Sequence, residues 1–410
     1  MLKGIINSAR RELFRLLSSR KLMFLLFAWP LMFCSFLASI YSAKVIKKMP
    51  VVICDKDNSQ LSRLAARYLG ATRSLDIIGH VDNADEIRQL LLRGKIEAGI
   101  YIPRGWAADM KRNRQVPLIA YANGGNMVIG NMITSDVKTV AGTISAGVRI
   151  KFLEKTGSST GQAKGTFMPV GTENFRLFNP GGNYMRFLAP GLWGAILMQV
   201  LLSLAVIALA SEKENGTMPQ AWAAAGNLAM PLLIGKMIPY CLLSFILMEI
   251  FEFVLYPVFG IPVKNPGGMA LANMAFIFAV ISGGMYISSI APTETDSLKG
   301  VLAVGAPAFI LYGYIWPLSA MPAGISAFAS IIPLTHYLKA LRPLSEYGAA
   351  VSQASSPLLT LFVLGVAYFV FAALNLRVAR QIFILKERKR QSAVMDCAEG
   401  KALPSGGAGV

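Results

Sequence analysis

Residues 188–210 read LAPGLWGAILMQVLLSLAVIALA, a continuous apolar stretch with no charged side chain. A helix of that length extends about 34 Å at 1.5 Å per residue, which is enough to cross the roughly 30 Å hydrocarbon core of a bilayer. Five further stretches are similarly long and contain few charges: residues 22–43, 231–257, 269–291, 300–320 and 356–376. The sequence therefore predicts an α-helical integral membrane protein with six transmembrane helices, the first at 22–43 and the others within 187–376.

Composition and charge place both ends of the chain on one side of the membrane. Hydrophobic residues make up 54% of the 410 residues and charged residues 15%, which is typical of a membrane protein. The net charge is +18, and six basic residues lie in 1–21 and six more in 377–390, beside the outermost apolar stretches. By the positive-inside rule both termini are cytoplasmic, which requires an even number of spans. Because the basic clusters flank spans, we expect no nucleic-acid partner.

The cysteines and histidines indicate neither a disulfide framework nor a metal site. Only one of the four cysteines, Cys54, lies in the long polar segment 44–186. The two histidines, His80 and His336, are far apart in the sequence and differ in setting. A histidine-based metal site or catalytic triad is therefore not expected.

Residues 44–186 form a long insertion between the first two spans, in which strand-like and helix-like patterns alternate. Apolar runs at 51–54, 75–81, 96–102 and 116–121 predict strands, and residues 60–69, 84–92 and 127–154 predict helices. We expect an inserted extracytoplasmic α/β (α+β) domain with its own core. Its 21 Lys and Arg against 11 Asp and Glu favour attraction to anionic headgroups or to an anionic partner surface, with a solvated basic surface as the alternative.

Three shorter segments lie outside the spans. Residues 1–21 place apolar and basic side chains at helical spacing, which predicts an amphipathic helix in the cytoplasmic interface, apolar face down and basic face toward headgroups. A cytoplasmic extension of the first span is the alternative. Residues 321–338 are interrupted by prolines and predict a re-entrant segment on the outer side. Residues 377–410 predict a basic cytoplasmic tail with a disordered end.

The loop after the second span carries a helix-start signal. Thr217 and Gln220 have capping-box spacing, and Gly216 permits a tight turn before them. The sequence therefore predicts a short helix at 217–229 on the cytoplasmic surface, held to the second and third spans. A helix in this place is suited to receive force from a partner protein. The alternative is that the capping signal marks only the start of a helix, with no docking role.

Few ionisable side chains lie within the apolar stretches. Glu249 and Glu252 are one turn apart, about 18 to 21 residues into the third span and so near its outer end. Lys339 and Arg342 lie three residues apart at the same outer level. These four side chains could pair as an outer gate, or the two carboxylates could simply reach the outer headgroup zone.

Several motifs occur in an order found in one protein family. Residues 212–217, EKENGT, closely resemble the E-[RK]-E-x-G-T signature of ABC-2 type exporter permeases. Four other stretches resemble motifs of the same family: DKDNSQLS at 55–62, IYIP at 100–103 followed by Trp106, FNP at 178–180 and PLTHY at 333–337. The resemblance covers nearly the whole chain and is specific to the drug- and lipid-exporting branch with a large extracytoplasmic domain.

The resemblance implies a permease that dimerises, with itself or with a similar permease, and binds cytoplasmic ABC ATPases through the helix after the signature. The ATPase-coupling residues would then be Glu212, Glu214, Gly216, Thr217 and Gln220. The sequence departs from the family at Pro219, where Leu or Val followed by Glu is common. The substrate would be hydrophobic or amphipathic, drug-like or lipid-like, and would leave the cytoplasm or inner leaflet.

Location, cofactors and further partners follow from the same resemblance. It implies a multi-pass protein of the bacterial inner membrane with residues 44–186 in the periplasm, contacting membrane lipids and a periplasmic adaptor. We expect no cofactor in this chain, since Lys236 is not preceded by a Walker pattern of glycines. ATP and Mg would be bound by the partner ATPase.

Two other classes of function fit the layout less well. A membrane receptor with 44–186 as its ligand sensor would need a cytoplasmic signalling domain, but only about 34 residues follow the last span. A membrane-embedded enzyme would need clustered His, Asp, Glu or Ser side chains in the spans, and the sequence does not cluster them. Co-purification of a P-loop ATPase would separate the exporter from both.

Overall fold

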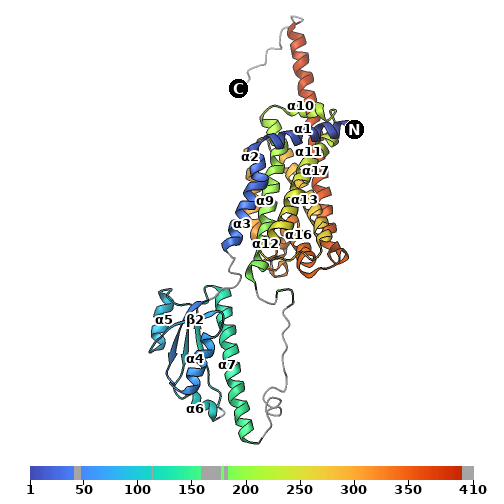
Figure 1. Ribbon diagram of the computed structural model, residues 1–410. Helices are drawn as coiled ribbons and strands as arrows, with labels where there is room; N and C mark the ends of the chain where they lie inside the picture. The colour runs from blue at the N-terminus through green and yellow to red at the C-terminus, as the bar shows by residue number, and fades with distance from the viewer. Residues whose placement is uncertain (41–47, 113, 158–176, 180–182, 399–410) are drawn as a thin grey trace, which may run out of the picture. The chain divides into compact units, whose positions relative to one another are not determined.

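The computed structural model describes residues 1–40, 48–112, 114–157, 177–179 and 183–398 (Figure 1). The chain divides into two compact units, which are described separately. One unit combines Met1–Ser42 with Asn183–Val410 and contains the long apolar helices, so we call it the helical unit. The other, Ala43–Gly182, contains all the strands of the described residues, and we call it the α/β unit.

The helical unit is a bundle whose long helices follow the apolar stretches of the sequence. Its elements are α1 (Leu2–Ser18), α2 (Arg20–Met23), α3 (Trp29–Ile40), α9 (Tyr184–Glu214), α10 (Met218–Ala224), α11 (Ala229–Ile250), α12 (Tyr256–Val258), α13 (Pro266–Ile290), α14 (Glu294–Leu311), α15 (Ala323–Ser330), α16 (Pro333–Arg342) and α17 (Ser355–Ala398). Single π turns at Phe24–Ala28 and Phe251–Leu255 join α2 to α3 and α11 to α12. Helix α13 packs against α9, α11, α16 and α17 and so forms the centre of the bundle.

Five helical segments of the described residues are long and apolar enough to cross a bilayer: Arg20–Ile40, Tyr184–Glu214, Ala229–Val258, Pro266–Ile290 and Val351–Gln381. A helical membrane protein is therefore confirmed at this level. The span predicted at 300–320 falls on α14, which has 18 residues and begins with the charged side chains Glu294, Asp296 and Lys299. Since its apolar part is short, six crossings stay a prediction.

Two segments outside the spans contain more helix than the sequence predicts. Residues 321–338, predicted to be re-entrant, contain α15 and most of α16, with Pro333 at the first turn of α16. The basic stretch 377–390 is helical, because α17 continues to Ala398. Disorder was predicted from about residue 391, and this is wrong for residues 391–398, which continue α17; residues 399–410 lie outside the described residues.

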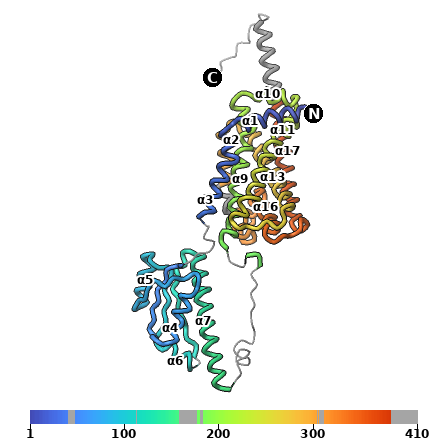
Figure 2. Tube along the Cα trace, in the orientation of Figure 1, coloured from blue at the N-terminus to red at the C-terminus, as the bar shows by residue number. Residues whose placement is uncertain are grey.

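The α/β unit is built on one four-stranded sheet with the order β2-β1-β3-β4. Strands β1 (Met49–Asp55), β2 (Leu75–His80) and β3 (Ala98–Ile102) are parallel, and β4 (Ile119–Ala122) is antiparallel to β3. The helices are α4 (Gln60–Gly70), α5 (Ala84–Leu92), α6 (Trp106–Lys111) and α7 (Met127–Lys155). Figure 2 shows this unit as a Cα trace, with α4, α5, α6 and α7 labelled.

Both faces of this sheet are buried, as the unbroken apolar run in β1 requires. Val51 and Ile53 face a core shared with α4 and α7, whereas Val52 and Cys54 face a smaller core closed by Ile87 of α5. Helices α4 and α7 therefore share one face of the sheet, and α5 covers the other.

The acidic turn after β1 is tied together by its own side chains. Asp55 Oδ1 accepts hydrogen bonds from the backbone N–H groups of Asp57 and Asn58, each at 3.0 Å, and its Oδ2 accepts one from the Ser62 hydroxyl at 2.6 Å. Ser59 and Ser62 form a capping box that starts α4. The DKDNSQLS stretch thus fixes the β1–α4 connection.

A buried ion-pair network joining α1, α9 and α11

The most unusual feature of the helical unit is a lysine that is 0% exposed. Lys236 lies in α11, and its ammonium group donates to Glu12 Oε2 at 2.6 Å, to Glu212 Oε1 at 2.9 Å and to the Ala208 carbonyl at 2.9 Å. Both carboxylates are also buried. All three donors of the ammonium group are therefore used, one to each of α1, the last turn of α9 and the turn before it.

Two arginines of α1 complete the network. Arg11 donates to both oxygens of Glu212, at 2.7 and 3.0 Å, in the bidentate geometry that makes such pairs strong. Arg15 bonds to Glu12, to the Ser211 hydroxyl and, at 2.9 Å, to the hydroxyl of Tyr240 in α11. Burial on its own would lower the pKa of Arg15, but Tyr240, Glu12 and Glu212 together raise it above its usual value, so the guanidinium stays charged.

Close backbone contact brings these groups together. A Cβ atom added to Gly235 of α11 would lie 2.5 Å from Ser8 Cβ and 2.8 Å from the Ile5 carbonyl oxygen, and one added to Gly4 would lie 2.6 Å from the Ala225 carbonyl oxygen. Only glycine fits at these positions. Helix α1 consequently lies across the end of the bundle, beside α10 and α11 (Figure 1).

This position corrects the predicted orientation of residues 1–21. The face of α1 that packs on the bundle carries Ser8, Glu12 and Leu16, and two of its basic residues point to buried carboxylates rather than toward headgroups. The physical reason is that a buried carboxylate is costly unless a cation pairs with it. The apolar side chains of Ile6, Phe14 and Leu17 are exposed on the surface of α1, where they could contact lipid.

The signature segment at the end of α9 connects further helices. The ammonium group of Lys213 donates to the carbonyl oxygens of Ser288, Ser289 and Ala291 at 2.8, 2.9 and 2.9 Å, at the end of α13. Glu214 accepts a hydrogen bond of 2.8 Å from the backbone N–H of Glu294, the first residue of α14. The three successive charged residues 212–214 therefore join α9 to α1, α11, α13 and α14.

The turn that follows leads into a short helix. Gly216 has a φ of 66°, the left-handed conformation that favours glycine. Thr217 occupies the N-cap position of α10, but its side-chain oxygen accepts no hydrogen bond from the helix backbone, so the predicted capping box is wrong. Its hydroxyl instead donates to Glu212. Glu212 accepts this hydrogen bond because burying a carboxylate is costly unless hydrogen-bond donors surround it.

Helix α10 is also shorter than the predicted 217–229. It ends at Ala224, since Gly226 and Asn227 have φ values of 67° and 60° and cannot continue a right-handed helix. Ala221 and Trp222 are buried against the bundle, whereas Gln220 is exposed. The surface that α10 presents is thus small, consisting of Pro219, Gln220 and Ala223.

Three of the four residues predicted to form an outer gate, Glu249, Glu252 and Arg342, contact other partners. Asn273 of α13 donates to Glu249 at 3.2 Å and to Glu252 at 3.0 Å, and the Tyr337 hydroxyl donates to Asn273 Oδ1 at 2.9 Å. Arg342 instead lies over the rings of Phe187 and Tyr314, with its Cζ 4.9 and 3.9 Å from their centroids. None of the ion pairs within 4 Å in the described residues joins two of these four residues, and the gate stays a prediction.

Sequence reasoning missed Glu12, Lys236 and Tyr240. One signal was available: Lys236 is an ionisable residue within an apolar stretch, and such residues are functional candidates by default. A second was the single carboxylate of the basic helix at 1–21. Neither signal identifies a partner, because the pairing joins residues more than 200 positions apart.

A bundle of long apolar helices with a charged junction at one end, together with a separate α/β unit, is the architecture of a multi-pass membrane protein. The chain belongs to the ABC-2 family transporter protein family, whose family model matches residues 20–374. Membership implies, in general terms, an ABC ATPase partner and a dimeric arrangement.

Named relatives agree with this assignment. The chain is 26% identical over 283 residues to the probable multidrug ABC transporter permease YbhS of Escherichia coli, covering 68% of this chain and 70% of that protein. It is 22% identical over 298 residues to the probable multidrug ABC transporter permease YbhR of the same organism, covering 70% and 75%. It is also 27% identical over 194 residues to ABC transporter G family member 20 of Dictyostelium discoideum, covering 46% of this chain but only 26% of that longer protein.

Proposed function

We propose that this chain is the membrane-spanning subunit of an ABC exporter that moves a hydrophobic or amphipathic, drug-like or lipid-like substrate out of the cytoplasm or inner leaflet. A separate ATPase subunit, which binds ATP and Mg, would supply the energy. The names of the two E. coli relatives, both described as probable multidrug permeases, support a substrate of this kind. The apolar walls of the spans are consistent with it.

The buried network is the observation that carries the proposal. A transport subunit driven from outside must pass a displacement at its surface on to its spans without loss. Lys236, Glu12 and Glu212 fix α1 to α9 and α11, and residues 213 and 214 fix the same turn of α9 to α13 and α14. A push on α10 would therefore move four spanning or near-spanning helices as one body.

The exposed face of α10 is the surface that we assign to the ATPase. It lies two residues beyond the glycine turn, so its position is set by the charged junction. Glu212 and Thr217 are joined by a hydrogen bond across this turn, whereas Gln220 is exposed and, with Pro219 and Ala223, is available for contact. The proposal also places both termini in the cytoplasm and the α/β unit in the periplasm of a bacterial inner membrane, in a homodimer or a heterodimer with a similar permease, with room for a periplasmic adaptor.

The test is purification of the permease with its bound partners, followed by reconstitution in vesicles. We expect a P-loop ATPase to co-purify, and its ATP hydrolysis to be stimulated by apolar or amphipathic compounds. Gln220→Arg should release the ATPase, whereas Gln89→Arg, at an exposed glutamine of α5, should not. Substrate movement by the permease without any ATPase would overturn the proposal.

A further inference from the structure

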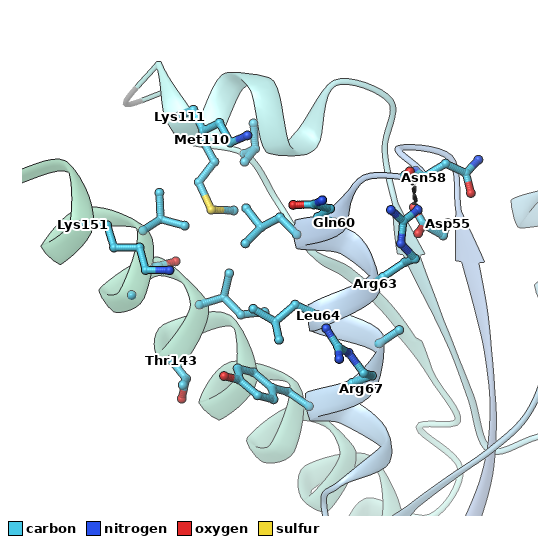
Figure 3. Close-up of a pocket in the computed structure, with 18 of the residues that line it drawn as sticks. Asp55, Asn58, Gln60, Arg63, Leu64, Arg67, Met110, Lys111, Thr143 and Lys151 are labelled. Atoms are coloured by element: carbon cyan, nitrogen blue, oxygen red, sulfur yellow. Dashed lines mark hydrogen bonds between the residues drawn. The ribbon is translucent and has the colours of Figure 1, made fainter. Parts of the chain in front are cut away.

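The α/β unit contains a large groove that the proposed coupling mechanism does not use. It lies between α4, α6 and α7, and its volume is about 1830 Å³ (Figure 3). Pockets for drug-sized ligands usually have volumes of roughly 300–1,000 Å³, so this groove is suited to a larger molecule. It extends to the turn after β1, where Asp55 and Asn58 lie.

Basic side chains come from all three helices that enclose the groove. They are Arg63 and Arg67 on α4, Lys111 on α6, and Arg149, Lys151 and Lys155 on α7. Two carboxylates also line it, and one of them, Asp55, already accepts three hydrogen bonds from its own turn. Figure 3 shows Arg67, Lys111 and Lys151 approaching the groove from its different walls. The electrostatic potential inside is therefore positive.

The floor between these cations is apolar. Its apolar lining residues come from the same three helices: Leu61 and Leu64 of α4, Met110 of α6, and Ile144, Val148 and Phe152 of α7. Figure 3 shows Leu64 and Met110 among them. Leu61, Leu64 and Val148 are only partly buried, and Phe152 is 43% exposed. The groove therefore leaves apolar surface exposed that a ligand with hydrocarbon groups would bury favourably.

We propose that this groove binds an anionic amphiphile, whose hydrocarbon chain lies on the apolar floor and whose phosphate or carboxylate head pairs with the surrounding cations. Neither feature alone would select such a ligand. A soluble anion would gain nothing from Leu64 and Phe152, and a neutral lipid would gain nothing from Arg67, Lys111 and Lys151. That this ligand is the transported substrate rests on the proposed function. The inference adds to that function that the substrate is anionic.

Binding can be measured without the ATPase, so the two proposals fail independently. The full-length permease in phosphatidylcholine nanodiscs would carry an environment-sensitive fluorophore on Thr143→Cys, which lines the groove. The probe is dodecyl phosphate below its micellar concentration. The comparison compounds are dodecylphosphocholine, which has the same chain and a zwitterionic head, and butyl phosphate, which has the head but a short chain.

We expect dodecyl phosphate to bind at least about tenfold more tightly than either comparison compound, with an affinity that falls as salt is added. The triple variant Arg67→Glu, Lys111→Glu, Lys151→Glu should abolish this preference. The matched control is Arg88→Glu, Arg93→Glu, Lys95→Glu, which reverses three exposed charges on and next to α5, on the other face of the sheet, and should change nothing.

A second pair of variants tests the floor. Leu64→Gln should weaken dodecyl phosphate and leave butyl phosphate unaffected, whereas Leu92→Gln, at a leucine of α5 that is 79% exposed, should affect neither. Equal affinity for the phosphate and phosphocholine probes would overturn the proposal, as would equal effects of the two triple variants. The proposal would also be overturned if an acidic amphipathic peptide changed the fluorescence and dodecyl phosphate did not. That result would show that the groove binds a protein ligand instead.

Discussion

Replacing Lys236 by methionine should release α1 from the bundle. The substitution keeps an unbranched side chain that is one atom shorter, but it removes the one group that touches the carboxylates of both α1 and α9. In the variant, Glu12 would be buried with one donor fewer. Its remaining partners, Arg15 and Tyr240, would still donate hydrogen bonds to it.

The size of the effect follows from burial. Removing one partner of a buried ion pair costs about 3–5 kcal/mol, and the remaining donors on Glu12 argue for the lower end, about 3 kcal/mol. Because about 1.4 kcal/mol corresponds to a factor of ten, the population with α1 detached should rise roughly 100-fold. An exposed ion pair provides the contrast, since such pairs contribute only about 0–1 kcal/mol.

The assay is the rate of maleimide labelling at Ser8→Cys, with the four native cysteines replaced by alanine. Ser8 is 4% exposed and faces Gly235, so labelling requires α1 to open. Lys236→Met should accelerate labelling about 100-fold by the estimate above. The control Lys299→Met breaks a pair with Asp296 of similar length, 3.0 Å, whose side chains are 71% and 43% exposed, and should accelerate it less than about fivefold.

The reasoning is refuted if the two lysine variants label at the same rate. A double-mutant cycle checks the assignment to Glu12 in particular. If the contact acts as described, Glu12→Gln and Lys236→Met should be non-additive by about 1–3 kcal/mol. Additive effects would mean that α1 is held by its packing alone.

Three further predictions concern other contacts. Gly235→Leu should detach α1 as Lys236→Met does, because the added Cβ would lie 2.5 Å from Ser8 Cβ; Gly267→Leu, where nothing lies within 4 Å, is the labelling control. Asn273→Ala should lower the melting temperature of the purified permease by removing about 1–3 kcal/mol, since the buried Tyr337 hydroxyl loses its acceptor and two carboxylates lose their donor; an unchanged melting temperature would contradict this. Burial lowers the pKa of His336 in the folded protein, because the charged imidazolium is disfavoured there. The folded state is therefore most stable above the pKa of the unfolded state, about 6.5, and this stability is lost as the pH falls through the folded-state pKa. Protease cleavage near His336 should rise on acidification, and it should not rise in His336→Gln.

The apolar pattern alone predicts much of the helical unit and the sheet. Hydrophobic length identifies the spans, and the unbroken run 51–54 indicates a strand that is buried on both faces. Local signals were less reliable where a long-range partner competes for a group. Thr217 has the sequence of a helix cap, yet its hydroxyl donates to Glu212. The position of α1 depends on the ion pair between Glu12 and Lys236, and the periodicity of a single sequence cannot predict that pair.

The geometry of α9 explains why three adjacent charges can serve three different neighbours. Successive residues of an α-helix point about 100° apart, so residues 212, 213 and 214 point in three different directions that together span about 200° around the helix axis. The carboxylate of residue 212 meets the cations of α1 and α11, the lysine meets the carbonyl oxygens at the end of α13, and the carboxylate of Glu214 meets the first N–H of α14. The last two contacts match the negative and positive ends of the helix dipoles. The order acid–base–acid is therefore fixed by which helix end lies on each side of α9, and a displacement at this turn reaches all of these helices at once.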